Sequence, residues 1–107
     1  MGDYLELYTE EYLKASSIMK ESSKEINEKY KEWKRAVETS LDPKTVELIS
    51  LGASIALRCS YCIDSHSQKA RARGATEKEI AAAVNIGAGI AAGAALSYGV
   101  LAFENKK

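Results

Sequence analysis

Residues 42–66 read DPKTVELISLGASIALRCSYCIDSH, and this stretch decides the fold. It contains a helix boundary, an apolar segment and the reactive side chains of the chain. Asp42 is a candidate N-cap, and Pro43 suits the first helical position because its missing N–H would be unpaired there. Residues 44–57 are apolar on most sides, which predicts a deeply packed helix. A break is expected at residues 59–60, where the serine is a candidate N-cap for the next helix.

Both cysteines and the single histidine of the chain lie within eight residues of one another. At helical pitch, Cys59, Cys62 and His66 fall within an arc of roughly 60°, so two sulfurs and an imidazole share one face. A thiol reacts as thiolate, which the helix N-terminus and the imidazole one turn later both favour at Cys62. Cys62 is therefore the preferred attacking sulfur and Cys59 its disulfide-forming partner, while the reverse assignment stays open.

The helix that carries these side chains is expected to end at Gly74, because glycine is common just after a helix. Before residue 42, apolar residues recur at steps of 3 and 4 with one gap near Ser22, which predicts two amphipathic helices within residues 3–40. Asp3 is a candidate cap for the first of them, and residues 22–25 read as a capping box for the second.

The last helix is expected to open with the capping box Thr-Glu-Lys-Glu at residues 76–79 and to extend to about Phe103. Residues 80–103 carry no charge and are long enough to span a bilayer. However, the segment is rich in Ala and Gly, contains Asn85 and has no basic flank on its entry side, where Glu77 and Glu79 frame Lys78. These features favour a buried helix at the centre of an oligomer over a membrane span.

Length and composition indicate a single all-α domain, formed by N-terminal helices 3–40 and a core at 42–103. Fifteen basic residues balance fifteen acidic ones without a basic block, so neither nucleic acid nor a membrane is expected as a partner. The first residues form no secretory signal, which makes the cytoplasm the expected compartment. With no strand-period segment and no Gly-rich phosphate loop, nucleotide binding is not indicated. No cofactor is expected.

One spacing pattern joins the two central helices: Glu47-(x11)-Cys59-x-Tyr61-Cys62-x3-His66. Over roughly residues 42–103 it resembles the active-site signature of the AhpD-like branch of the carboxymuconolactone decarboxylase family. The resemblance implies an all-α AhpD-like bundle, assembled as a trimer or hexamer, with a redox disulfide and peroxidase or disulfide reductase activity. Glu47, which the residues alone indicate only as a solvated first-turn carboxylate, becomes a base in a proton relay. Tyr61 stands where the better-known alkyl hydroperoxide reductase member has a histidine, and is a possible secondary site residue.

We therefore predict a thiol-dependent alkylhydroperoxidase or disulfide reductase that acts in antioxidant defence. A hydroperoxide or disulfide would be the substrate, and a peroxiredoxin, a thioredoxin-like protein or a lipoyl protein the electron partner.

Other interpretations of the same residues stay open. A zinc site could use Cys59, Cys62 and His66 with Glu47 as a fourth ligand, although structural zinc usually takes two ligand pairs and the prediction is no metal. Inert cysteines beside a core histidine would make a structural module. A lactone decarboxylase would not use the cysteines, but the decarboxylases of the family lack the pair. Covalent haem attachment is excluded because Ile63, and not a histidine, follows the second cysteine.

Overall fold

The computed structural model describes residues 6–104, and over this range the chain forms helices and no strand. The all-α fold predicted from the sequence is confirmed. The chain divides into two compact units between residues 43 and 44.

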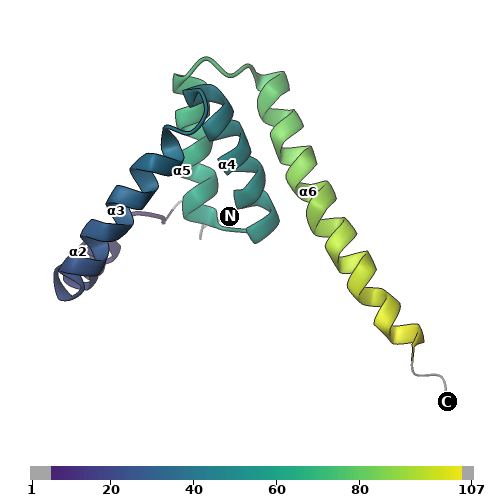
Figure 1. Ribbon diagram of the computed structural model, residues 1–107, viewed down its shortest axis with the longest axis horizontal. Helices are drawn as coiled ribbons and strands as arrows, with labels where there is room; N and C mark the ends of the chain where they lie inside the picture. Colours follow the sequence, from purple (N-terminus) through teal and green to yellow (C-terminus); the bar gives the residue numbers. More distant parts are fainter. Residues whose placement is uncertain (1–5, 105–107) are drawn as a thin grey trace. The chain divides into compact units, whose positions relative to one another are not determined.

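The first unit contains α2 (Glu10–Ser22) and α3 (Lys24–Glu38), as Figure 1 shows. Helix α2 begins after Thr9, whose hydroxyl accepts the backbone N–H of Tyr12 at 3.1 Å. The N-cap expected at Asp3 lies outside the described residues.

The predicted break between these helices is confirmed at Ser23, but the predicted capping box does not form. Ser23 makes no side-chain capping bond to α3. Its hydroxyl instead donates to the carbonyl of Met19 at 2.8 Å, so it completes the end of α2. Serine competes for nearby carbonyls in this way because its side chain is short and polar.

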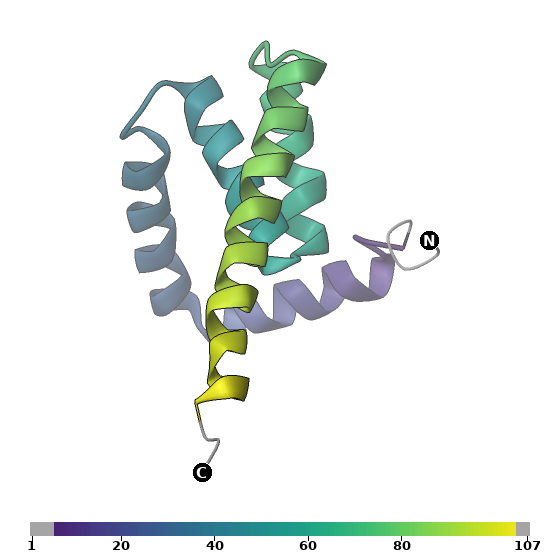
Figure 2. The same ribbon diagram turned by 90° about the vertical axis from the view of Figure 1, so that its right-hand side faces the viewer.

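The second unit contains α4 (Pro43–Leu57), α5 (Ser60–Ala72) and α6 (Glu77–Gly99), followed by a 3-10 turn at Val100–Phe103. The predicted start of α4 at Pro43 is confirmed. A small core joins the three helices, and its buried members are Leu51 from α4, Ala70 from α5, and Ile80 and Ala83 from α6. Figures 1 and 2 both show α6 running well past the ends of α4 and α5.

The start of α6 is held by the predicted capping box, which is confirmed. The hydroxyl of Thr76 accepts the Glu79 N–H at 3.1 Å, and the Glu79 carboxylate accepts the Thr76 N–H at 2.8 Å. The same carboxylate pairs with Lys44 at 2.9 Å, which ties the first turn of α4 to that of α6. The bond from Thr76, aided by Lys44, holds the pKa of the Glu79 carboxyl below its ordinary value.

Helices α4 and α6 cross at two glycines, and their backbones touch there. A Cβ on Gly87 would overlap the carbonyl oxygen of Gly52. A Cβ on Gly52 would lie 3.2 Å from the carbonyl oxygen of Ala83. The crossing therefore depends on the absence of side chains at both positions.

Replacing Gly87 by alanine is expected to destabilise the second unit by about 1–3 kcal/mol, because the added methyl group forces two backbones apart. Urea unfolding followed by circular dichroism measures the change. Gly89→Ala is the matched control, since a Cβ at Gly89 meets nothing within 4 Å. Alanine there should be neutral or stabilising by up to about 1 kcal/mol. Equal losses in the two variants would contradict the close crossing.

The prediction that α4 is deeply packed is wrong for the single chain. Its buried residues are Val46, Glu47, Leu51 and Ser54. Ile49 and Leu57 are 58% and 78% exposed. Helix α6 likewise buries residues of its first half, whereas Ile90 and Leu96 are 66% and 76% exposed. Three helices provide too few neighbours to cover such apolar segments on all sides.

Among the described residues, one helical segment, 77–103, has the length and apolar composition that could cross a membrane. Length and composition alone are weak evidence for a membrane span, because a long apolar helix in the core of a soluble protein meets the same two criteria.

Candidate active site

The corner between α4 and α5 positions the cysteines. Helix α4 ends at Leu57 and is followed by Arg58, whose backbone is left-handed with φ of 57°. The Arg58 N–H donates to the Ile55 carbonyl and the Cys59 N–H to the Ser54 carbonyl, each at 3.1 Å. These two bonds form a Schellman motif, which closes a helix and turns the chain sharply. Cys59 is thereby fixed to the end of α4.

Cys59 is also the N-cap of α5. Its backbone is extended, with φ of −94° and ψ of 101°, and its sulfur accepts the Cys62 N–H at 3.2 Å. The serine predicted as N-cap at position 60 is instead the first helical residue. The expectation that all three reactive side chains share one regular helical face is therefore wrong for Cys59. A sulfur can replace a serine oxygen as cap because it too accepts a hydrogen bond.

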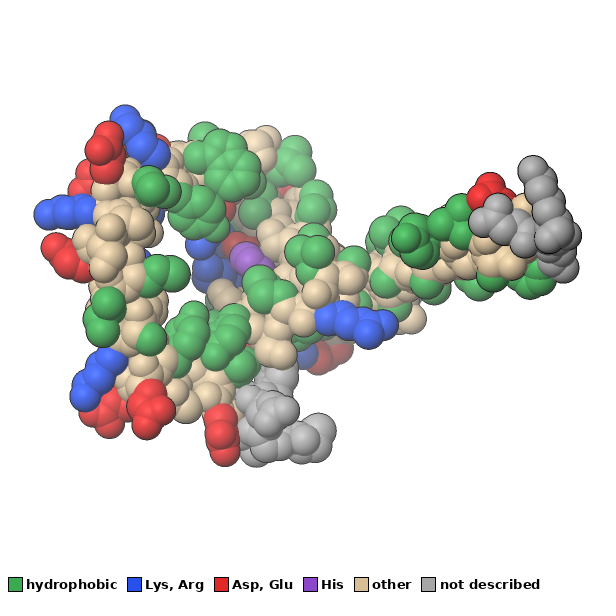
Figure 3. Space-filling view, turned by 90° about the horizontal axis from the view of Figure 1, so that it is seen from below, with side chains coloured by type: hydrophobic (Ala, Val, Ile, Leu, Met, Phe, Trp, Pro, Cys, Tyr) green, Lys and Arg blue, Asp and Glu red, His purple; other side chains and the backbone are tan. Residues whose placement is uncertain are grey.

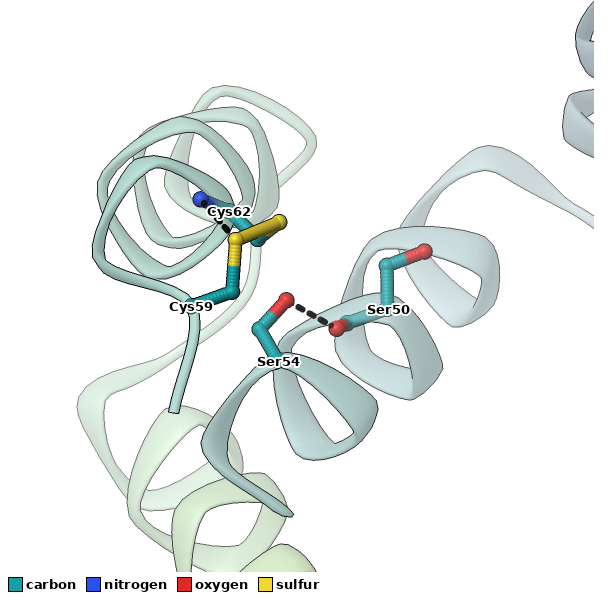
Figure 4. Close-up of a disulfide and its surroundings, with 4 residues drawn as sticks. All are labelled: Ser50, Ser54, Cys59 and Cys62. Atoms are coloured by element: carbon teal, nitrogen blue, oxygen red, sulfur yellow. Dashed lines mark hydrogen bonds between the residues drawn. A yellow bond between two sulfur atoms is a disulfide. The ribbon is translucent and has the colours of Figure 1, made fainter. Parts of the chain in front are cut away.

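Cys59 and Cys62 form a disulfide, with Cα atoms 5.2 Å apart. Figure 4 shows the bond at the N-terminal end of α5, with the buried Ser54 of α4 beside it. The Ser54 hydroxyl donates to the carbonyl of Ser50 at 2.6 Å. Tyr61, the possible secondary residue, lies between the two cysteines in the first turn of α5 and is partly buried.

Glu47 and His66 meet between α4 and α5. The imidazole Nδ1 of His66 lies 2.6 Å from Glu47 Oε1. The His66 side chain is 20% exposed, and the Glu47 side chain is 4% exposed. The interpretation of Glu47 as a solvated carboxylate is wrong, because the first turns of α4 face α5. Burying a carboxylate is costly unless it is paired, and the imidazole is the partner that the structure provides.

This contact also orients the imidazole. With the carboxylate ionised and the imidazole neutral, Nδ1–H donates to Glu47 and Nε2 carries the lone pair. His66 follows Cys62 by one helical turn, a spacing at which side chains of a helix are neighbours. The arrangement can accept a proton at Nε2 and stabilise the imidazolium that results. It combines an oxidisable sulfur pair with an oriented base.

Within residues 6–104, no group of three or more His, Cys, Asp or Glu side chains is arranged to hold a metal ion. In the disulfide the two sulfurs are bonded to each other, and thiolate ligands are unavailable in that state.

Residues 24–105 match the model of the carboxymuconolactone decarboxylase family. A relative from Paracoccus denitrificans, described as uncharacterized protein 4 in the cox locus, is 36% identical over 59 residues. This match covers 55% of the chain and 53% of the relative, so the chain spans about half the length of this curated relative.

A crystal structure of a protein from Methanobacterium thermoautotrophicum is similar over most of the chain. Its TM-score is 0.74 at 32% sequence identity, and the match covers 83% of this chain and 99% of that one. The helical architecture is thus shared with an experimentally determined structure.

Proposed function

Since the chain belongs to the carboxymuconolactone decarboxylase family, we propose that it is a thiol-dependent oxidoreductase of the AhpD-like branch. It reduces hydroperoxides or disulfides through Cys59 and Cys62, in antioxidant defence. The observation that carries this proposal is the Cys59–Cys62 disulfide at the start of the helix that also presents His66, paired with buried Glu47. A structural role alone would not require an oriented base one turn from a sulfur.

With a hydroperoxide, a thiolate of the reduced pair attacks the outer peroxide oxygen. The O–O bond breaks, the alkoxide takes a proton and leaves as an alcohol, and the attacking cysteine becomes a sulfenic acid. The second cysteine then attacks this sulfur and water departs, which forms the Cys59–Cys62 disulfide. Two electrons pass from the dithiol to the peroxide, and the products are one alcohol and one water.

In this reaction, His66 transfers the proton and Glu47 stabilises the protonated imidazole. Nε2 takes the proton of a thiol, and the buried carboxylate stabilises the imidazolium through Nδ1–H. The same imidazolium can then give its proton to the leaving alkoxide.

Different features of the corner between α4 and α5 favour the thiolate form of each cysteine. The Cys62 N–H is directed at the Cys59 sulfur, which favours negative charge on Cys59 in the reduced state. The position of His66 one turn from Cys62 favours proton removal from Cys62 instead. Single-cysteine variants separate the two assignments.

The disulfide must be reduced again before the next turnover. A peroxiredoxin, a thioredoxin-like protein or a dihydrolipoyl protein would supply two electrons by thiol–disulfide exchange. We place the cycle in the cytoplasm, where the thiol pool is reducing.

Thiol trapping followed by mass spectrometry tests the proposed function. Reduced protein should form one Cys59–Cys62 disulfide per chain after one equivalent of hydroperoxide or of a small disulfide, and dithiothreitol should reverse it. Thiols that neither oxidant changes would overturn the proposal. Stoichiometric zinc with protected thiols, in protein purified without chelator, would favour the metal-binding alternative.

We also propose that the chain assembles with copies of itself, as a trimer or hexamer. Helices α4 and α6 line an apolar pocket of about 450 Å³ that includes Leu48, Ile49, Ile86 and Ile90. Figure 3 shows hydrophobic side chains along the part of α6 that extends past its neighbours. Contiguous apolar surface of this kind usually marks a protein interface.

Ile90→Glu is expected to shift the protein to smaller species in sedimentation velocity, because a carboxylate in an apolar interface loses its hydration. Lys78→Glu is the control, since it introduces the same side chain at an exposed residue in the first turn of α6. A wild-type protein that sediments as a monomer would contradict the proposed assembly.

A further inference from the structure

Arg58 adopts a conformation that arginine rarely takes. It occupies the position after α4 at which glycine is usual, with φ of 57°, and there a Cβ is strained against the backbone. Its side chain is exposed. Within residues 6–104 the guanidinium makes no ion pair or hydrogen bond that would offset the strain. A strained residue whose side chain makes no ion pair or hydrogen bond among the described residues points to a role outside the fold.

Arg58 is also the cation closest in sequence to the disulfide. It directly precedes Cys59, and residues 45–68 contain no other lysine or arginine. Neither neighbouring carboxylate pairs with Arg58: Glu47 faces His66, and Asp64 accepts the Gln68 amide at 3.0 Å. Within the described part of the chain, Arg58 is therefore an exposed cation without an ion pair, one residue before Cys59.

We propose that Arg58 determines substrate specificity by binding a carboxylate of the disulfide or hydroperoxide that approaches Cys59 and Cys62. The inference rests on the proposed thiol function and adds the charge class of its substrate. The planar guanidinium suits a carboxylate because two N–H groups can donate in parallel to its two oxygens. Cationic substrates are repelled at the same place.

A single turnover with small disulfides isolates this effect. In protein reduced and then freed of reductant, one cysteine thiolate attacks a substrate sulfur and releases the first thiolate. The other cysteine attacks the mixed disulfide, releases the second thiolate and forms Cys59–Cys62. The dithiol supplies both electrons, and its two protons pass to the released thiolates or the buffer. No further reductant enters the reaction.

The experiment compares three aliphatic disulfides of different charge: 3,3′-dithiodipropionate, bis(2-hydroxyethyl) disulfide and cystamine. Wild-type protein should react in the order anionic, neutral, cationic. In Arg58→Asn, which removes the charge but tolerates a left-handed backbone, the anionic-to-neutral rate ratio should fall about fivefold. Arg58→Lys should keep most of the preference. Added salt should lower the ratio in wild type but not in Arg58→Asn.

Arg73→Gln is the matched control. Arg73 is an exposed cation at the C-terminal end of α5, a helix length away from the disulfide. Its loss should leave all three rates as in wild type. Arg58→Gly should also raise the melting temperature, because glycine relieves the strain. A lower melting temperature would show that Arg58 serves the fold and would overturn the proposal.

An anionic-to-neutral ratio equal in wild type and Arg58→Asn would overturn the specificity role, and so would a loss uniform across the three disulfides. In either case, reduction of disulfides by wild type would leave the proposed function intact. Wild-type protein that reduces none of the three would instead remove the thiol function on which the inference rests.

Discussion

Serine in place of Cys59 or Cys62 is expected to lower turnover of hydroperoxides and disulfides to the uncatalysed rate. Both sulfurs are needed because the cycle closes through the bond between them. The variant that keeps the attacking sulfur should still react once and stop as a sulfenic acid or mixed disulfide. The variant that lacks it should not react. Mass spectrometry of the trapped products therefore identifies the attacking cysteine.

Ser60→Ala is the control for these variants. Ser60 lies between the cysteines at the first helical position of α5, where its side chain makes no capping bond. Its loss should leave turnover at the wild-type rate. If both cysteine variants also kept wild-type rates, the activity would not depend on thiols, and a decarboxylase-like reaction would replace the proposed one.

Glu47→Gln and His66→Phe are expected to slow peroxide reduction by about 100-fold near neutral pH, a typical effect of losing general acid–base catalysis. Phenylalanine removes the imidazole base itself. Glutamine keeps the shape of Glu47 but removes the charge that orients and stabilises the imidazolium. Stopped-flow measurement of disulfide formation gives both rates.

The loss should shrink as the pH approaches that of free thiol ionisation, about 8.5, because the thiolate then forms without a base. Asp64→Asn is the matched control, since this carboxylate of α5 binds Gln68 and not His66. Wild-type rates in Glu47→Gln and His66→Phe at neutral pH would remove both residues from the mechanism.

Several elements could be predicted from the sequence because their causes are local. Pro43 begins a helix since it lacks an N–H, and Thr76 and Glu79 cap the last helix through bonds that span three residues. Cys59 and Cys62 are close enough to pair because they are three residues apart. The capping box expected at residues 22–25 does not form, because Ser22 is the last residue of α2 and the Ser23 hydroxyl donates to the carbonyl of Met19.

Other features could not be derived from local pattern. Glu47 lies 19 residues before His66, so helical periodicity cannot relate them, and only a family resemblance included Glu47 in the site. The close approach of Gly52 to Gly87 depends on how two helices cross. The left-handed backbone of Arg58 had no sequence signal, because glycine is the residue expected there.

The sequence by itself determined the all-α class, the start of α4 and α6, and the pairing distance of the two cysteines, because each depends on hydrogen bonds or side chains a few residues apart. Only the tertiary structure decided that Cys59, which follows the end of α4, caps α5, and that Glu47 is buried against His66. It also decided that Arg58, one residue before Cys59, has a left-handed backbone. These features arise where one helix ends against another, and their energies depend on burial and contacts between segments.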